Sequence, residues 1–155
     1  TSSSGLYGNF GQSNYSAAKM ALVGLMQTLA LEGERHGVRV NCLAPTAATA
    51  MTEGVLPPEA LARLQPAYVS PALVALVADD APTRTILLAG AGSFESAHVT
   101  MTEGIFVDAT TGVAEQVAAR LDEVCERRGE RVPGTGFEQY QHELAKAGFA
   151  VPLPH

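Results

Sequence analysis

The chain has 155 residues, of which 46% are hydrophobic, and its formal net charge is −6. This size and composition suffice for a globular domain with a hydrophobic core. The acidic balance argues against nucleic acid as a partner, and no apolar run reaches the roughly 18 residues of a membrane span, so we expect neither nucleic acid nor a membrane as a partner.

The first elements are a strand end at residues 1–4 and a loop at residues 5–12, where three glycines permit tight turns. A helix is predicted to begin with Ser13 as its N-cap and to run to about Glu34. Its apolar residues extend nearly all the way round. We therefore expect one side to pack on a sheet and the other on a partner subunit, although burial within a single chain would give the same pattern.

The next segment reads as a turn followed by a buried strand. Gly37 suits the position just after a helix, and Val38 to Ala44 has the composition of a parallel strand, which Pro45 is expected to end. Helix followed by strand favours an α/β fold with right-handed crossovers. Ligands bind at the carboxyl ends of strands in such folds, so residues 46–50 should lie beside one.

Residues 51–65 suit a mobile lid, with a short helix after Pro57-Pro58. Ser70-Pro71 is expected to open a helix over residues 72–78, and residues 85–89 should form the last strand of the sheet before a turn at 90–92. Helices are also predicted at 114–128 and 137–147. Neither carries a chemical motif, and the charged residues of the first read as a solvated face: Glu123, Glu126, Arg127 and Arg128.

Cysteine and histidine are sparse. Cys42 and Cys125 are interpreted as free thiols in a reducing compartment, which indicates the cytoplasm, and as small buried residues. The histidines are isolated in sequence, so we predict no metal site: His36, His98, His142 and His155.

Tyr15 and Lys19 are the pair that points to chemistry. They are four residues apart at the start of the predicted long helix, so their side chains share one face, one turn apart. A tyrosine phenol is a weak acid with a pKa of about 10 in water, and a nearby ammonium group stabilises its phenolate. Such a pair can take a proton from an alcohol or return one to a carbonyl.

Tyr15-x-x-x-Lys19, with Ser2 thirteen residues before the tyrosine, resembles the active site of the short-chain dehydrogenase/reductases. Longer stretches resemble the (3R)-hydroxyacyl-CoA dehydrogenase domains of peroxisomal multifunctional enzymes: residues 8–19, 41–45, 51–53, 66–71 and 90–92. The resemblance is strong from residue 2 to about residue 92 and thin beyond it.

The resemblance implies the C-terminal part of a doubly wound, Rossmann-type α/β fold, with a parallel sheet and flanking helices. Residues 1–92 would be the C-terminal half of the dehydrogenase domain, and residues 93–155 a mostly helical extension. Neither G-x-x-x-G-x-G nor G-x-G-x-x-G follows a strand in this sequence. We therefore expect the chain to be part of a longer protein and to require an N-terminal half for cofactor binding.

The resemblance also implies the roles of the site residues. Tyr15 would exchange the proton of a secondary alcohol, Ser2 would donate to the substrate oxygen, and Lys19 would support Tyr15 and hold the nicotinamide ribose. The nicotinamide end of NAD or NADP, with NAD favoured, would meet a loop of four residues: Ala47, Ala48, Thr49 and Ala50.

The expected reaction interconverts a 3-hydroxyacyl-CoA and a 3-oxoacyl-CoA. Reduction of a 3-oxoacyl group on carrier protein and dehydrogenation of a steroid remain open, because the same three residues serve all of them. The expected assembly is a homodimer or homotetramer formed through helix 13–34. A non-catalytic alternative is a truncated, inactive fragment that only oligomerises.

Overall fold

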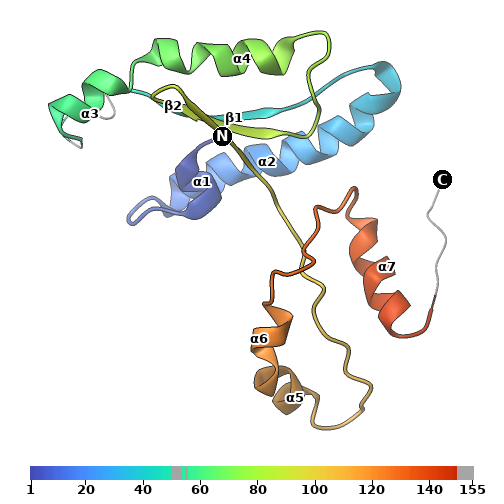
Figure 1. Cartoon of the computed structure of the whole chain (residues 1–155). Coiled ribbons are helices and arrows are strands. Elements are labelled where there is room, and N and C mark those ends of the chain that lie inside the picture. The colour runs from blue at the N-terminus through green and yellow to red at the C-terminus, as the bar shows by residue number, and fades with distance from the viewer. Residues whose placement is uncertain (50–53, 55, 150–155) are drawn as a thin grey trace. The chain divides into compact units, whose positions relative to one another are not determined.

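The computed structural model describes residues 1–49, 54 and 56–149, and it divides into two compact units, Thr1–His98 and Val99–His155 (Figure 1). The first unit holds a three-stranded sheet in the order β1-β2-β3, formed by Cys42–Thr46, Ile86–Gly90 and Ser93–Ala97. Its helices are α1 (Ser3–Tyr7), α2 (Ser13–Gly33), α3 (Pro58–Arg63) and α4 (Ser70–Val77). Helices α2 and α4 lie on opposite sides of the sheet (Figure 1), which confirms the predicted α/β fold.

The hydrophobic core joins α2 to the sheet. Val23 and Met26 of α2 are buried against Cys42 of β1 and Ile86 of β2. Leu6 of α1 is packed against the same cluster. The parallel pairing of β1 with β2 places Cys42 directly beside Ile86, so both strands present side chains to the same helix.

Strand β1 differs from the prediction at both ends, since it begins at Cys42 and continues through Pro45 to Thr46. The expectation that Pro45 ends the strand is therefore wrong. The Cys42 amide donates to the Thr85 carbonyl of the neighbouring chain segment, at 2.8 Å. Amides alternate in direction along a strand, so the nitrogen of Pro45 points away from β2 and no ladder hydrogen bond is lost.

Strand β2 is not the last strand, contrary to the prediction, because β3 pairs with it in the antiparallel sense. Gly90 pairs with Ser93, so Ala91 and Gly92 alone form the connecting turn. Their φ angles are 52° and 81°. Two consecutive positive φ angles match the right-handed twist of a hairpin, and this allows the chain to reverse in two residues.

The predicted strand end at residues 1–4 is also wrong, because Ser3–Tyr7 forms helix α1. Ser2 is the N-cap of this helix, and its side-chain oxygen accepts a hydrogen bond from the Ser4 amide at 3.2 Å. The following helix has Gln12, not Ser13, at its N-cap position. Near its far end, Gly37 adopts the left-handed conformation with φ of 67°, as expected for a helix stop.

Helix α2 is packed on the sheet along one side and exposed along the other. Val23, Met26 and Ala30 are buried. Three leucines on the other side are 40–54% exposed: Leu22, Leu25 and Leu29. The predicted packing of one side on the sheet is confirmed, and the covering of the opposite side by a partner remains a prediction.

Helix α3 confirms the short helix expected after Pro57-Pro58, and α4 confirms the helix expected after Ser70-Pro71. The remainder of the predicted lid falls partly outside the described residues, which omit 50–53 and 55.

The second unit contains α5 (Val113–Ala119), α6 (Leu121–Val124) and α7 (Phe137–Lys146). Helix α7 confirms the prediction for residues 137–147. The helix predicted over 114–128 is interrupted at Arg120 and ends at Val124, and nothing in the local sequence explains the break. None of the described side chains of residues 99–149 is buried, so this part of the chain has no core of its own.

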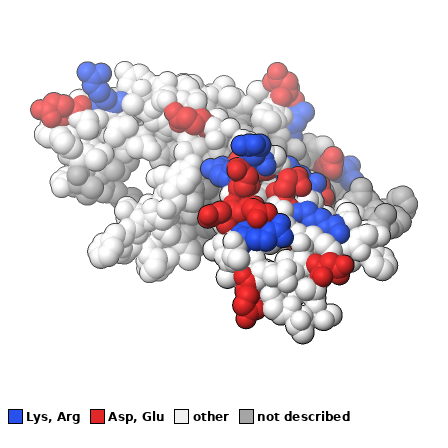
Figure 2. Space-filling view, turned by 60° about the horizontal axis from the view of Figure 1, so that its bottom comes forward, with Lys and Arg blue, Asp and Glu red and all other residues white. Residues whose placement is uncertain are grey.

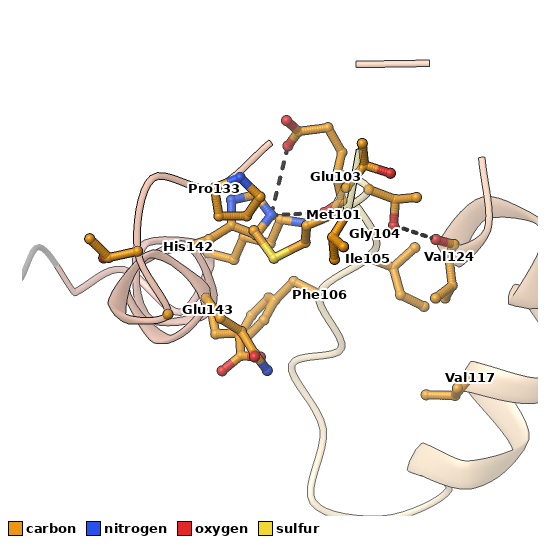
Figure 3. Close-up of a pocket in the computed structure, with 17 residues that line it drawn as sticks. Met101, Glu103, Gly104, Ile105, Phe106, Val117, Val124, Pro133, His142 and Glu143 are labelled. Carbon is orange, nitrogen blue, oxygen red and sulfur yellow. Dashed lines mark hydrogen bonds and ion pairs between the residues drawn. The ribbon is translucent and has the colours of Figure 1, made fainter. Parts of the chain in front are cut away.

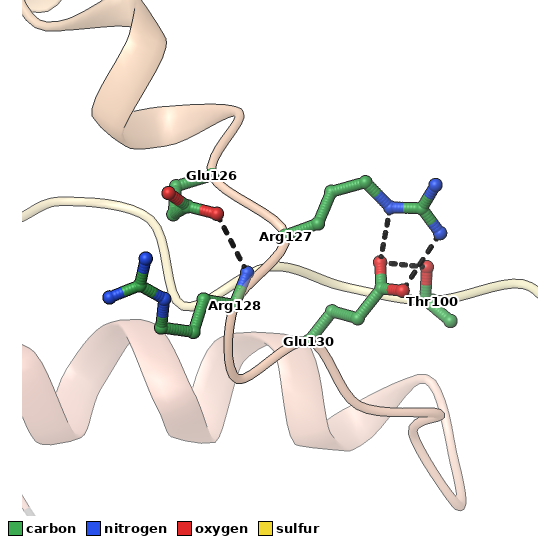
Figure 4. Close-up of polar contacts among 5 residues, drawn as sticks. All are labelled: Thr100, Glu126, Arg127, Arg128 and Glu130. Carbon is green, nitrogen blue, oxygen red and sulfur yellow. Dashed lines mark hydrogen bonds and ion pairs between the residues drawn. The ribbon is translucent and has the colours of Figure 1, made fainter.

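Charged side chains of both signs lie beside one another on the face shown in Figure 2. Arg120 pairs with Glu123 at 2.7 Å and Arg127 with Glu130 at 2.8 Å, and Glu130 also accepts from the Thr100 hydroxyl (Figure 4). The hydrogen bond from Arg127 lowers the pKa of the Glu130 carboxyl. The interpretation of this region as a solvated, mixed-charge face is confirmed. Among the described residues, no helix is long and apolar enough to cross a membrane.

Asn41 joins three segments of the first unit through its side chain. Its Nδ2 donates to the carbonyl of Pro82 at 2.7 Å and to that of Leu76 at 3.4 Å. Its Oδ1 accepts from the Thr85 amide at 3.0 Å. The residue before β1 is thereby tied to the end of α4 and to the entry of β2.

The variant Asn41→Ala should lower the free energy of unfolding by about 2–3 kcal/mol, because it leaves three backbone groups without their partner. Asn41→Asp should cost more than Asn41→Ala at neutral pH. It retains the acceptor for Thr85 but turns a carboxylate oxygen towards two carbonyls. Denaturant unfolding of the full-length protein measures both, and an Asp variant as stable as the parent would contradict this role.

The two free cysteines have opposite environments. Cys42 is 7% exposed in the core, and its thiol donates to the Leu22 carbonyl, with a sulfur–oxygen distance of 3.6 Å. Burial raises the pKa of the Cys42 thiol. Cys125 is exposed, so the prediction that both cysteines are buried is wrong for Cys125.

Iodoacetamide at mildly alkaline pH should alkylate Cys125 at least about tenfold faster than Cys42, because the thiolate is the nucleophile and a raised pKa leaves less of it at any given pH. Peptide mapping by mass spectrometry measures the two rates in one sample. Denaturant provides the control, since it should make the rates similar. Equal rates in the folded protein would contradict the burial of Cys42.

Candidate active site

Tyr15 and Lys19 lie on successive turns at the start of α2, as predicted. The Lys19 ammonium nitrogen is 5.4 Å from the centroid of the Tyr15 ring, and both residues are half-buried. This distance is within the range of a cation–π contact. The Asn14 side chain accepts from the Tyr15 amide at 2.8 Å and so helps to start the helix. The pair can therefore place a positive charge beside a phenol.

The backbone of Lys19 is anchored by Thr1. The Thr1 hydroxyl donates to the Lys19 carbonyl at 2.7 Å. The backbone nitrogen of Thr1 donates to the Leu43 carbonyl in β1 at 2.9 Å. Thr1 thus links α2 to the sheet at the level of Lys19.

Gly5 of α1 lies directly against Lys19. A Cβ atom added at Gly5 would be 2.9 Å from the Cβ of Lys19 and 3.0 Å from its carbonyl carbon. Glycine is thus the residue that permits α1 to approach α2 at this point. Thr1 and Gly5 bracket Ser2 in sequence, so the segment carrying Ser2 is held against the turn of α2 that carries Lys19.

Ser2 has extended backbone angles, with φ of −159° and ψ of 152°, and is half-buried. Its oxygen accepts the capping bond from Ser4, which uses a lone pair and not the hydroxyl proton. The proton can still be donated to another group. Capping and the predicted donation to a substrate are therefore compatible at this residue.

The predicted cofactor loop follows β1 and is held from the other side by the end of α3. The Ala48 amide donates to the Leu64 carbonyl at 2.6 Å. Ala47 and Ala48 are half-buried and Thr49 is exposed, whereas Ala50 lies outside the described residues. Because β1 and β2 are parallel, this loop and the 91–92 turn leave the sheet at the same edge.

A cavity of about 760 Å³ lies elsewhere, within the second unit (Figure 3). Apolar side chains such as Met101, Ile105 and Phe106 line it. Its polar groups are bound to one another, since His142 contacts the Glu103 carbonyl at 2.9 Å and the Lys146 ammonium donates to the same oxygen. None of the predicted catalytic residues lines it. This cavity is therefore separate from the candidate site at Tyr15 and Lys19.

Sequence reasoning did not single out Thr1 and Gly5. Gly5 lies three residues after Ser2, in a stretch whose glycines predict tight turns. In the structure Gly5 belongs to helix α1, and glycine is needed there because a side chain would collide with α2.

A sequence model of short chain dehydrogenases matches residues 1–59. A short-chain type dehydrogenase/reductase of Mycobacterium tuberculosis is 42% identical over 135 residues, which cover 86% of this chain and 47% of that protein. The peroxisomal hydratase-dehydrogenase-epimerase of Neurospora crassa is 50% identical over 84 residues, or 54% of this chain and 9% of that protein.

The full-length peroxisomal multifunctional enzyme type 2 from Drosophila melanogaster has a similar structure. The TM-score is 0.81 and the sequence identity 29%, over 97% of this chain and 28% of that one. The chain thus spans less than half the length of each of these relatives. Motif, fold and relatives agree that the chain belongs to the short-chain dehydrogenase/reductase family.

Proposed function

We propose that this chain carries the catalytic residues of an NAD(P)-dependent oxidoreductase that interconverts a secondary alcohol and a ketone. The chief support is the position of the Lys19 ammonium, 5.4 Å from the ring centroid of Tyr15. A cation held over the ring can stabilise negative charge that develops on the tyrosine oxygen while its proton moves to or from a substrate.

In the proposed mechanism, Tyr15 accepts the hydroxyl proton of the alcohol during oxidation and returns it to the ketone oxygen during reduction. Ser2 donates its proton to the same substrate oxygen and orients it. Lys19 stabilises the phenolate. The bound nicotinamide supplies the hydride acceptor or donor.

The residues present fit the nicotinamide end of the cofactor. Lys19, a half-buried residue, would hold the ribose hydroxyls through its ammonium group, and the loop after β1 carries short alanine side chains. The proposed binding residues are Tyr15 and Lys19 with four loop residues: Ala47, Ala48, Thr49 and Ala50. NAD is proposed over NADP on the family likeness.

The proposed substrates are a 3-hydroxyacyl-CoA and the corresponding 3-oxoacyl-CoA. The support is the likeness of 84 residues of this chain to a protein whose name includes hydratase-dehydrogenase-epimerase. Reaction in the cytoplasm is proposed from the two free thiols. Comparing kcat/KM for an acyl-CoA, an acyl-carrier-protein and a steroid substrate would discriminate among the three substrate classes.

We further propose that residues 93–155 form a mostly helical C-terminal extension of the dehydrogenase domain. Strand β3, the first element of this segment, belongs to the first compact unit, and the remaining elements belong to the second. The lack of buried side chains in residues 99–149 supports packing of this unit on another surface of the full-length protein.

In the full-length protein, Tyr15→Phe should lower kcat about 10²- to 10⁴-fold, because it removes the proton-transferring hydroxyl and keeps the ring. Nicotinamide fluorescence should show that NADH still binds. The matched control is Tyr140→Phe, which should retain activity, because Tyr140 lies on α7 with its ring against Phe137. Turnover by Tyr15→Phe at the parent rate would rule out this mechanism. Failure of the full-length protein to bind NADH would favour the non-catalytic alternative.

The proposed homodimer or homotetramer forms through the helix predicted at residues 13–34. Leu25→Glu should dissociate the assembly, because it places a charge in the exposed apolar side of α2. Leu73→Glu on α4 is the matched variant, since both leucines are 54% exposed, and it should leave the α2 contact intact. Sedimentation velocity measures both. An unchanged mass for Leu25→Glu would exclude α2 as the interface.

A further inference from the structure

We propose that Thr1 and Gly5 are positioning residues of the candidate active site, which together set where Lys19 lies relative to Ser2. The inference rests on the proposed function and deepens it. Neither residue is expected to touch the substrate or the cofactor. Both act through the backbone of Lys19.

Thr1 acts through two hydrogen bonds in different directions. Its hydroxyl reaches the Lys19 carbonyl at 2.7 Å, and its backbone nitrogen reaches the Leu43 carbonyl at 2.9 Å. Thr1 therefore fixes the position of α2 relative to β1. The carbonyl it contacts belongs to Lys19 itself, so the lysine side chain starts from an anchored backbone.

Gly5 acts by leaving space. A Cβ atom at this position would be 2.9 Å from the Lys19 Cβ and 3.0 Å from the Met20 amide nitrogen. Carbon–carbon contacts are favourable at about 3.5–4.0 Å, so any side chain would separate the two helices by more than about half an ångström. The neighbouring atoms are backbone and Cβ atoms, which cannot swing aside as a long side chain can.

Ser2 is coupled to both contacts because it lies between them in the chain. It is the N-cap of α1, so a displacement of α1 from α2 carries Ser2 away with it. The distance between the hydroxyl that orients the substrate and the charge that supports Tyr15 is therefore controlled at Thr1 and Gly5. Proton transfer is sensitive to such shifts, since a misplacement of about 1 Å can cost about 10²-fold in rate.

The test uses kcat and thermal stability of the full-length protein, measured in parallel for each variant. Gly5→Ala should lower kcat about 10- to 100-fold at saturating substrate and cofactor. Gly136→Ala is the matched control, because Gly136 has a helical φ of −63° and no atom within 4 Å of an added Cβ. It should leave kcat within about twofold of the parent.

Thr1→Val and Thr1→Ser are a second pair of variants. They test the positioning role even if Gly5→Ala does not fold. Thr1→Val keeps the shape and removes the hydroxyl, so kcat should fall several-fold. Thr1→Ser keeps the hydroxyl and should restore kcat to within about twofold of the parent. A merely structural role would lower the melting temperature of Thr1→Val without this difference in kcat.

Parent-like kcat for folded Gly5→Ala, or equal kcat for Thr1→Val and Thr1→Ser, would overturn the positioning role. Tyr15→Phe is measured in the same series. If it is inactive while the Thr1 and Gly5 variants match the parent, only the positioning inference fails. If Tyr15→Phe retains full turnover, the proposed function fails and the positioning inference fails with it.

Discussion

Helix α1 approaches α2 closely because residue 5 has no side chain. The approach leaves 2.9 Å between the site of a Gly5 Cβ and the Cβ of Lys19, and the Thr1 hydroxyl fixes the same turn of α2 from its carbonyl side. Leu6 then reaches the core formed by Val23, Met26, Cys42 and Ile86. The contact thus links the position of Lys19, the proposed partner of Tyr15, to the packing of the first unit.

The Ser2 hydroxyl can also take part in two interactions at once. Its oxygen caps α1 by accepting from the Ser4 amide, and its proton stays available for donation. A hydroxyl can serve both purposes because it accepts and donates through different positions. The cap fixes the side chain, and a fixed donor loses less conformational freedom when a substrate oxygen arrives. If Ser2 has the proposed role, one hydroxyl both caps α1 and donates to the substrate.

The exposed apolar surfaces have a common physical meaning. Several apolar side chains of the first unit are exposed: Leu22, Leu25 and Leu29 on α2, and Leu73 and Val77 on α4. The described side chains of residues 99–149 are all partly or fully accessible. Scattered exposed apolar residues are ordinary, whereas contiguous ones on a helix mark contact surfaces. These are the side chains that the proposed assembly through α2 and the proposed packing of residues 99–149 would cover.

The sequence by itself determined the α/β class, the long helix with Tyr15 and Lys19 on one face, the stop at Gly37, and the helices after Pro57-Pro58 and over 137–147. These features follow from local periodicity, φ preferences and capping, which act over a few residues. Only the tertiary structure decided that residues 3–7 are helical, that Pro45 lies within a strand, that β3 follows β2, and that Cys125 is exposed. It also decided the contacts of Thr1 and Gly5 with Lys19, because a hydrogen bond 18 residues away and a helix–helix contact depend on which segments meet in space, and no local pattern records that.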